Sequence, residues 1–233
     1  MSGAAEIRLI SANGMREVIA DTQAAFEAAS GHKLIVTVVE TGEIRRRVLA
    51  GEACDVVIVP ANAMDPFIKA GKVEPNPTPT VVINFGLAVR ADAARPDVAT
   101  PAALRRTLLA ARTVLITDPS TGGISGVHLM EVLETLGIAD AMKAKLKPNP
   151  GGAIHAARVV NGEADLAVQA EHEIRSVPGA AFLDYPKEFQ RPIVFLAGIG
   201  AASHDAAAAR TYIAFLKGPE VAAAIAAHHL TPA

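Results

Sequence analysis

Short apolar runs alternate with stretches of helical periodicity from the start of the chain. Residues 33–40 are rich in β-branched side chains, which is typical of a strand. Between 15 and 29, by contrast, Val18, Thr22 and Phe26 recur at helical spacing on one face. The predicted strands are 7–10, 33–40 and 56–59, and the predicted helices are 15–29, 43–50 and 64–70. This order predicts a parallel sheet with right-handed crossovers.

A proline-rich segment, residues 73–79, interrupts this rhythm. Its alternating prolines predict a stiff extended connection of the kind found between lobes. A long strand is expected next, at 81–90, and then a new series in which Thr100 caps a helix and Pro101 takes its first turn. The remaining elements are predicted as strands at 113–117, 165–169 and 192–199, and as helices at 123–136, 138–146, 153–161, 205–217 and 219–228.

The two series predict an α/β protein of two lobes, each a mostly parallel sheet flanked by helices. We place lobe 1 at residues 1–82 plus 196–233 and lobe 2 at residues 83–195. The final helices would then return to pack on lobe 1. A single doubly wound domain is the alternative, and we find no internal repeat.

Composition and charge exclude several classes of function. With 51% hydrophobic residues, the chain of 233 residues has ample material for a core, and disorder is excluded. A formal net charge of -2 gives no electrostatic basis for binding nucleic acid. Aromatic residues make up only 4% and Trp is absent, so stacking of bases or sugars is disfavoured.

The sequence points to no metal and no cofactor. Cys54 is the only cysteine, so an intrachain disulfide cannot form and a zinc site based on cysteine lacks ligands. Because Cys54 adjoins the buried-looking run 55–59, we interpret it as an inert core residue.

No stretch has the roughly 20 apolar residues of a membrane span. Residues 1–6 also lack a basic segment followed by an apolar one. We therefore expect a periplasmic protein if a signal peptide was removed, and a cytoplasmic one if the chain as written is full length.

Three strand-to-helix turns carry the candidate chemistry: 11–14, 40–43 and 118–126. Each brings glycine and a small hydroxyl or amide side chain to a helix N-terminus, where free N–H groups and the helix dipole favour anions. In a parallel sheet these turns gather at the carboxyl ends of the strands, where ligand crevices form. Simple helix capping is the alternative. The turns match neither the Walker pattern nor the Rossmann fingerprint.

Several segments together resemble a known family. They are Ser11-Ala12-Asn13-Gly14-Met15, residues 26–33, Thr41-Gly42-Glu43, Gly51-Glu52-Ala53-Cys54-Asp55-Val56, Asn161-Gly162-Glu163-Ala164-Asp165 and residues 212–220. In order and spacing they resemble the molybdate-binding-protein branch of the type II periplasmic binding fold, which serves ABC importers. The resemblance implies a monomer with a ligand cleft between the lobes, a small anionic ligand and an ABC permease as partner.

The turns and the resemblance together define a candidate ligand set. It consists of Asn13, Gly14, Thr41, Gly42, Ser120, Thr121, Gly122, Gly123, Ser125, His128 and Gln169. Within it, Asn13 and Thr41-Gly42 replace serines of the molybdate binders, and Gln169 or a neighbour replaces their tyrosine. These departures make a small carboxylate the alternative to molybdate.

The same resemblance opens a second class of function, because aconitate isomerases are similar to this branch. Shifting a double bond beside carboxylates requires anion clamps and one general base, for which histidine is suited. His128, just inside the helix after the third turn, is our candidate base, ahead of His155 and His172. One arginine of the run 45–47 would clamp a carboxylate, although a solvated outer face is the simpler interpretation. A cytoplasmic ligand sensor is a third possibility.

Overall fold

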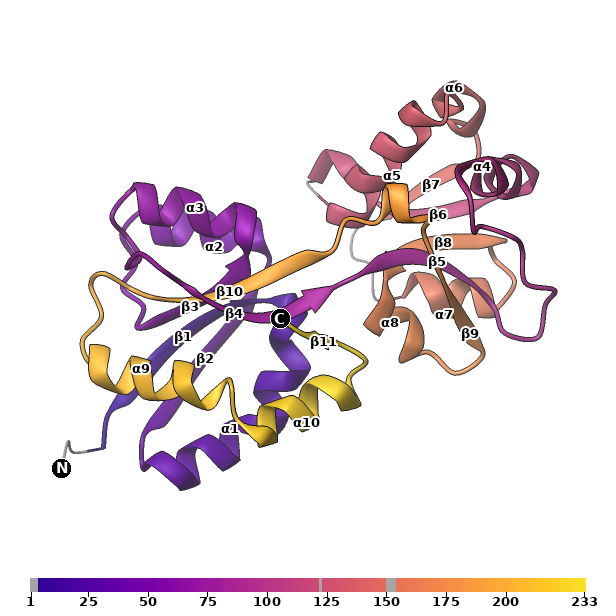
Figure 1. Cartoon of the computed structure of the whole chain (residues 1–233). Coiled ribbons are helices and arrows are strands. Elements are labelled where there is room, and N and C mark those ends of the chain that lie inside the picture. The colour runs from indigo at the N-terminus through magenta and orange to yellow at the C-terminus, as the bar shows by residue number, and fades with distance from the viewer. Residues whose placement is uncertain (1–3, 122, 150–153) are drawn as a thin grey trace. The chain divides into compact units, whose positions relative to one another are not determined.

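The computed structural model describes residues 4–121, 123–149 and 154–233, and its chain divides into two compact units. Unit 1 comprises residues 1–83 and 193–233, and unit 2 comprises residues 84–192. The chain thus passes between the units after Ile83 and again after Pro192, whereas the sequence placed these crossings after residues 82 and 195. Figure 1 shows the elements of each unit.

Unit 1 is built on a six-stranded mixed sheet of order β11-β4-β10-β3-β1-β2. Its strands are β1 (Glu6–Ala12), β2 (Lys33–Val39), β3 (Val56–Pro60), β4 (Thr78–Ile83), β10 (Ile193–Ile199) and β11 (Thr231–Pro232). β1 pairs in parallel with both β2 and β3, while β10 runs antiparallel to β3 and β4. The helices are α1 (Arg16–Ser30), α2 (Thr41–Leu49), α3 (Ala61–Lys69), α9 (Ala206–Phe215) and α10 (Pro219–Ala227).

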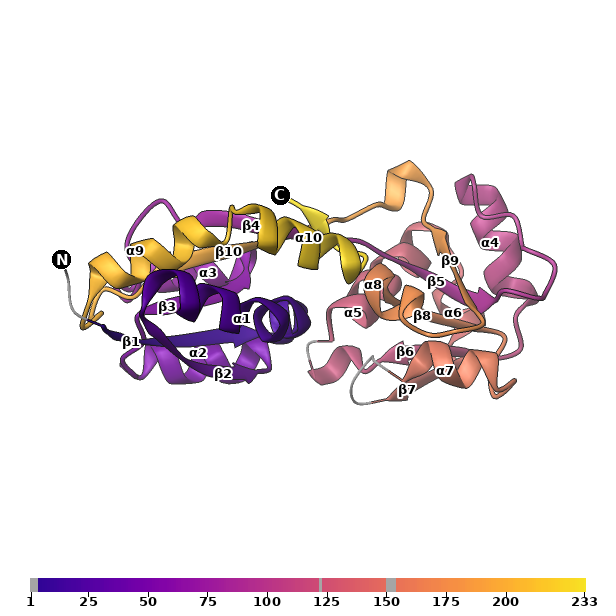
Figure 2. The same cartoon turned by 90° about the horizontal axis from the view of Figure 1, so that it is seen from below.

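Helices cover both faces of this sheet. α2 and α3 pack together on one face, and α1 packs with α9 and α10 on the other (Figures 1 and 2). The second layer is held by aromatic packing, with the ring of Phe26 5.0 Å from that of Tyr212 and 5.3 Å from that of Phe215. The prediction that the C-terminal helices return to the first lobe is confirmed by these contacts.

Unit 2 has a five-stranded sheet of order β7-β6-β8-β5-β9. Its strands are β5 (Phe85–Arg90), β6 (Val114–Thr117), β7 (Leu146–Asn149), β8 (Leu166–Ala170) and β9 (Ala180–Asp184). Its helices are α4 (Pro101–Ala110), α5 (Ile124–Thr135), α6 (Ala139–Met142), α7 (His155–Val160) and α8 (Glu171–Arg175). β6 pairs in parallel with β7 and β8, and β5 runs antiparallel to β8 and β9. Two apolar clusters, one containing Leu104 and Leu129 and the other Ala156 and Ile174, form its core.

The predicted long strand at 81–90 is wrong, because Asn84 divides the run between two sheets. β4 ends at Ile83 and pairs with β10, whereas β5 begins at Phe85 and pairs with β8 and β9. The Asn84 carbonyl accepts from the Glu171 N–H at 2.9 Å, which ties this residue to unit 2. The polar Asn84 marks this division within the run 81–90, whose apolar residues on either side belong to different sheets.

The proline-rich segment 73–79 was predicted to connect the lobes, and this prediction is wrong. It lies within unit 1, where Val73 is buried and forms a bridge to Gly200. The Glu74 N–H donates to the Ile199 carbonyl at 2.8 Å, and Thr78 already belongs to β4. The prolines therefore shape the entry to a strand.

Two strands of unit 2 were missed. The predicted helix at 138–146 stops at Met142, and β7 begins at Leu146. β7 contains Pro148 but lies at the edge of its sheet, where a proline costs no ladder hydrogen bond. β9 is the other edge strand, and its sequence Ala-Ala-Phe-Leu-Asp shows no clear alternation of apolar and polar residues.

The structure also shows an internal repeat, where none was found in the sequence. α2 and α7 each end in a glycine with positive φ, Gly51 at 94° and Gly162 at 79°. The glutamate that follows each glycine pairs with an arginine of the preceding helix: Glu52 with Arg47 and Glu163 with Arg158. The two copies differ by one residue in length, Glu52 to Asp55 against Glu163 to Asp165, which hides the repeat in the sequence.

Each copy ends in an aspartate that clasps the neighbouring parallel strand. Asp55 accepts from the N–H of Arg8 at 2.7 Å, and Asp165 accepts from the N–H of Arg112 at 2.7 Å. Asp55 is only 1% exposed and also accepts from the Ser203 hydroxyl and the His204 N–H, both at 2.8 Å. Burial opposes ionisation of Asp55, but these hydrogen bonds together hold its pKa below the ordinary value.

We expect Asp55→Ala to lower the free energy of unfolding by about 3–5 kcal/mol, because buried donors lose their acceptor. Asp165→Ala should cost about 1 kcal/mol, since the Asp165 side chain is 31% exposed and water can replace it. Equilibrium urea denaturation of both variants measures the difference. Equal losses for the two variants would contradict the buried clasp.

Candidate functional site

In unit 1 the first two candidate turns lie side by side. β1 and β2 pair in parallel up to Ala12 opposite Val39, so both strands end at one edge of the sheet. A short 3-10 turn (Asn13–Met15) follows β1 and leads into α1, and Thr41 begins α2. The parallel pairing therefore brings Asn13 next to Glu40 across 27 residues of sequence.

Asn13 bridges two charged side chains that the sequence did not single out. Its Nδ2 donates to Oε1 of Glu40 at 2.6 Å, and its Oδ1 accepts from Nη2 of Arg16 at 2.6 Å. Arg16 is exposed at the first residue of α1, where the positive end of the helix dipole disfavours a cation. This position at the start of a predicted helix was the sequence signal that could have singled out Arg16. Asn13 thus already uses its side chain to position Arg16 and Glu40.

The glycines of these turns have different roles. A Cβ on Gly14 would lie 2.6 Å from Ile83 and 2.7 Å from Phe195, so this residue is glycine because β4 and β10 pack on it. A Cβ on Gly42 would meet nothing within 4 Å. Gly42 therefore leaves open space beside the first turn of α2, into which a ligand can approach the backbone.

The third turn, in unit 2, is closed by its own hydrogen bonds. The Ser120 hydroxyl and N–H donate to the same oxygen of Asp118 at 2.7 and 2.8 Å, and these bonds lower the Asp118 pKa. The Gly123 N–H donates to the Asp118 carbonyl at 3.2 Å, and Ser125 donates to the Thr117 hydroxyl at 3.1 Å. Gly122 and the side chain of Thr121 lie outside the described residues.

Glycine in this turn also lets α5 sit tightly against the end of β6. A Cβ on Gly126 would lie 1.9 Å from the Thr117 carbonyl oxygen, and one on Gly123 would lie 2.3 Å from the Thr117 side chain. The N–H groups of the first turn of α5 are thereby fixed at the carboxyl end of β6.

Helix capping does not explain the candidate turns. α1, α2 and α5 have no side-chain cap among the described residues. α4 and α9, which begin elsewhere, are capped by Thr100 and Asp205, the first as predicted, while α3, α6, α7, α8 and α10 also lack a side-chain cap among the described residues. The Arg16 N–H donates to the Asn13 carbonyl within the 3-10 turn, whereas no described side chain of the turns accepts from the first N–H groups of α2 and α5.

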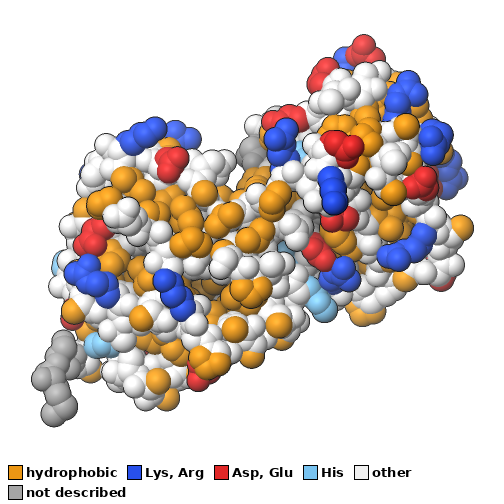
Figure 3. Space-filling model, in the orientation of Figure 1, with side chains coloured by type: hydrophobic (Ala, Val, Ile, Leu, Met, Phe, Trp, Pro, Cys, Tyr) orange, Lys and Arg blue, Asp and Glu red, His pale blue; other side chains and the backbone are white. Residues whose placement is uncertain are grey.

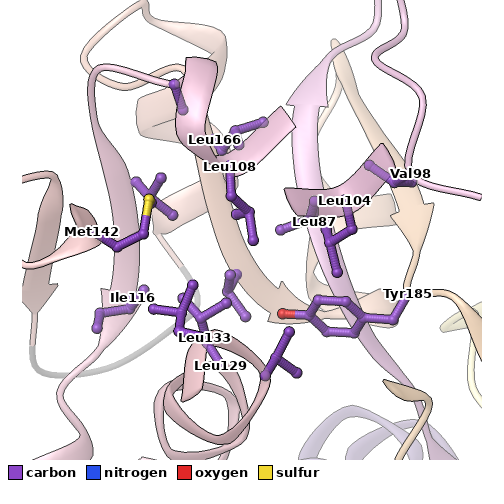
Figure 4. Close-up of a cluster of buried hydrophobic side chains, with 14 of the residues drawn as sticks. Leu87, Val98, Leu104, Leu108, Ile116, Leu129, Leu133, Met142, Leu166 and Tyr185 are labelled. Atoms are coloured by element: carbon purple, nitrogen blue, oxygen red, sulfur yellow. The ribbon is translucent and has the colours of Figure 1, made fainter. Parts of the chain in front are cut away.

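His128 lies against the apolar core of unit 2. It is 7% exposed, and its ring meets that of Tyr185 edge to face at 5.1 Å. Figure 4 shows Tyr185 beside Leu104 and Leu129 in this cluster. Burial lowers the His128 pKa, against smaller opposing effects of the Phe189 backbone and Glu131. The imidazole is therefore neutral at pH 7.

Gln169 lies at the carboxyl end of β8 and is fully buried. Its Oε1 accepts from the Ala156 N–H at 2.9 Å, which ties β8 to the start of α7. Its Nε2 and both ring nitrogens of the fully buried His155 have no hydrogen-bond partner within the described part of the chain. Burial also lowers the pKa of His155. β6 and β8 are parallel neighbours, so Gln169 and the third turn belong to the same sheet edge.

Two of the three arginines after the second turn form ion pairs with glutamates in α2 or just after it. Arg46 pairs with Glu43 in bidentate fashion at 2.9 and 2.6 Å, and Arg47 pairs with Glu52. Arg45 is exposed. The interpretation of the run as a charged outer face agrees with these contacts.

Burial raises the pKa of Cys54 to about 11, helped by the charge of Asp55, so its thiol is unreactive, as expected. Basic and acidic side chains are interspersed on the face shown in Figure 3. No helix in the described part of the chain has the length and apolar character needed to cross a bilayer.

The arrangement described so far is that of a protein that binds a small ligand: two α/β units with uncapped helix N-termini at the carboxyl ends of their strands. A sequence model of the family described as bacterial extracellular solute-binding protein matches residues 7–231, and the chain belongs to this family.

Individual relatives agree in fold. Two are solved structures: the substrate-binding domain assigned to a molybdenum ABC transporter of Clostridium difficile and the periplasmic molybdate-binding protein of Azotobacter vinelandii. The first has a TM-score of 0.81, is 17% identical, and covers 99% of this chain and 100% of its own. The second has a TM-score of 0.71, is 20% identical, and covers 97% of this chain and 98% of its own. The predicted class, two α/β lobes of the type II periplasmic binding fold, is confirmed.

One relative is named as an enzyme. An aconitate isomerase from a Pseudomonas species is 29% identical over 237 residues, which covers 97% of this chain and 87% of that protein.

Gly42→Ala tests the second turn. We expect this variant to fold with unchanged or slightly higher stability, since alanine favours a helix and its Cβ has room. Its affinity for an anion should fall at least tenfold, because the methyl group blocks access to the N–H groups. Gly126→Ala is the contrasting variant, expected to lower thermal stability by displacing α5 from Thr117. Thermal unfolding and calorimetric titration measure both, and normal binding by Gly42→Ala would exclude this turn.

His128→Leu tests the buried histidine. Because burial depresses the His128 pKa, the folded state gains stability above the ordinary pKa of about 6.5 and loses it as the pH falls through the lower folded value. Between roughly pH 8 and 5 the wild type should therefore lose more stability than His128→Leu. Urea midpoints at both pH values measure this, and parallel losses would contradict it. His155 contributes a similar loss to both proteins.

Proposed function

We propose that this protein is a solute-binding component that captures a small anion, an oxyanion or a small carboxylate, for an ABC importer. The observation that carries the proposal is that α2 begins without a side-chain cap at the carboxyl end of a parallel strand, with open space beside Gly42 in its first turn. N–H groups without intramolecular partners at a helix N-terminus bind anions. Membership of an extracellular solute-binding family supports the same conclusion.

Each unit contributes donors to the ligand in this proposal. Unit 1 supplies the N–H groups of Thr41 and Gly42 and the hydroxyl of Thr41, with Asn13 and Gly14 shaping the adjoining turn. Unit 2 supplies the first turn of α5, around Ser125, and Gln169 offers an unpartnered amide. Closing the two units on the anion would remove water, which strengthens each hydrogen bond to the charge, and would create the shape that a permease recognises. We further propose that the protein acts in the periplasm.

A second candidate function is isomerisation of a small polycarboxylate. The similarity to an aconitate isomerase, at 29% identity, exceeds the identities of 17% and 20% to the two solved structures. An anion site of this kind would bind substrate carboxylates equally well. His128 is 7% exposed and packs its ring on Tyr185, and as a general base it would have to lie within hydrogen-bond distance of the substrate.

A thermal-shift screen tests the proposal. The panel comprises molybdate, tungstate, sulfate, phosphate, citrate and both aconitate isomers. An anion present at a hundred times its dissociation constant should add about 2.7 kcal/mol of stability. We expect at least one anion to stabilise the protein, and we expect Gly42→Ala to lose about half of that stabilisation or more.

Failure of every anion would overturn the proposal. To separate transport from catalysis, each aconitate isomer is then incubated with the protein and followed by proton NMR. Stabilisation without conversion supports a binding protein. Conversion of one isomer into the other would establish the isomerase instead.

A further inference from the structure

Unit 1 holds one cation and one anion beside the proposed site that do not neutralise each other. Arg16 and Glu40 are both exposed and are connected only through the amide of Asn13, at 2.6 Å on either side. Neither forms an ion pair within 4 Å among the described residues. In contrast, Arg46 and Arg47 of α2 are each paired with a glutamate. Arg45 and Glu17 are likewise exposed and form no ion pair among the described residues, so the shared bond to Asn13 is what distinguishes Arg16 and Glu40.

The position of Arg16 is costly to the isolated unit, because a cation in the first turn of a helix opposes the helix dipole. One N–H and one oxygen lone pair of the Asn13 amide bond to the two groups and hold them at a fixed spacing. Residues that break a local rule without local compensation mark functional sites.

The chemistry of the pair defines the ligand that would complete it. A guanidinium binds a carboxylate through two parallel hydrogen bonds, and the bond to Asn13 occupies only one of its five N–H groups. An ionised glutamate can only accept hydrogen bonds, so it repels a fully deprotonated oxyanion and attracts a hydroxyl group. A ligand that carries a carboxylate and a hydroxyl satisfies both groups, whereas molybdate satisfies only Arg16.

We propose that unit 1 recognises a hydroxycarboxylate, with Arg16 binding a carboxylate of the ligand and Glu40 accepting a hydrogen bond from its hydroxyl group. Asn13 positions both side chains and does not itself bind the ligand. This inference rests on the proposed anion-binding function and narrows it to one chemical class. Sequence reasoning reached Asn13 but neither of the residues that it holds.

Matched pairs of acids test the inference by calorimetric titration. Citrate is compared with propane-1,2,3-tricarboxylate, and malate with succinate, because each pair differs by one hydroxyl group. We expect the wild type to prefer the hydroxylated member of at least one pair by tenfold or more, since a hydrogen bond to a charged acceptor would be lost. Molybdate is included as an anion without a hydrogen-bond donor.

Two substitutions assign the roles. Glu40→Ala should remove the preference for the hydroxyl group and strengthen binding of the unhydroxylated acid, because a repelling charge is gone. Arg16→Gln should weaken both members of a pair at least tenfold, and Arg16→Lys should restore part of the loss, since it returns the charge without the planar fork. Lys69→Gln and Asp65→Ala, exposed substitutions in α3 of the same unit, are the matched controls and should leave every affinity unchanged.

The outcomes separate this inference from the proposed function. If the wild type binds none of these anions, the proposed function itself fails. If it binds anions without a preference for the hydroxyl group, binds molybdate alone, or is unaffected by Arg16→Gln, the proposed function stands and the assignment of Arg16 and Glu40 is wrong. Circular dichroism and thermal unfolding without ligand verify that each variant is folded.

Discussion

The buried carboxylate of Asp55 fixes three segments of unit 1 at one point. It lies just before β3, accepts the N–H of Arg8 in β1, and accepts the hydroxyl of Ser203 and the N–H of His204. Four donors on one ion, namely these three and Nε of Arg8 at 3.3 Å, outweigh the cost of its burial, so the amino ends of β1 and β3 are aligned. Because strands have a fixed rise per residue, aligning one end also sets where the candidate turns emerge at the other. Asp165 makes the corresponding clasp in unit 2, although it is more exposed.

The two edges of each sheet therefore differ in how fully their hydrogen-bonding groups are satisfied. At the amino edge, each aspartate accepts several hydrogen bonds, although Nη2 of Arg8 has no partner among the described residues. At the carboxyl edge, the helices after the candidate turns begin without side-chain caps, and polar side chains nearby bond to one another. Stability is concentrated at one edge and unused hydrogen-bonding capacity at the other. A binding protein needs this separation, since a site whose donors were already satisfied would have nothing to offer a ligand.

The charges at the carboxyl edges bear on which ligand is suitable. Acidic groups stand in both units: Glu40 beside the second turn and Asp118 within the third. A site for a bare oxyanion gains nothing from such neighbours, whereas a ligand with its own hydrogen-bond donors can use them. The two solved structures named for molybdenum or molybdate thus share the architecture of this chain, but they do not specify its ligand.

The sequence by itself determined the local elements and the fold class. Periodicity predicted most helices and strands, Thr100 was correctly placed as a cap, and the resemblance gave the two-lobed fold. These features depend on neighbouring residues or on a family pattern. What only the tertiary structure decided depends on residues far apart in the chain. The division at Asn84, the repeat around Asp55 and Asp165, and the meeting of Asn13 with Glu40 all follow from strand pairing. A one-dimensional pattern records whether a residue is apolar or polar, but it cannot show which distant strand that residue lies beside.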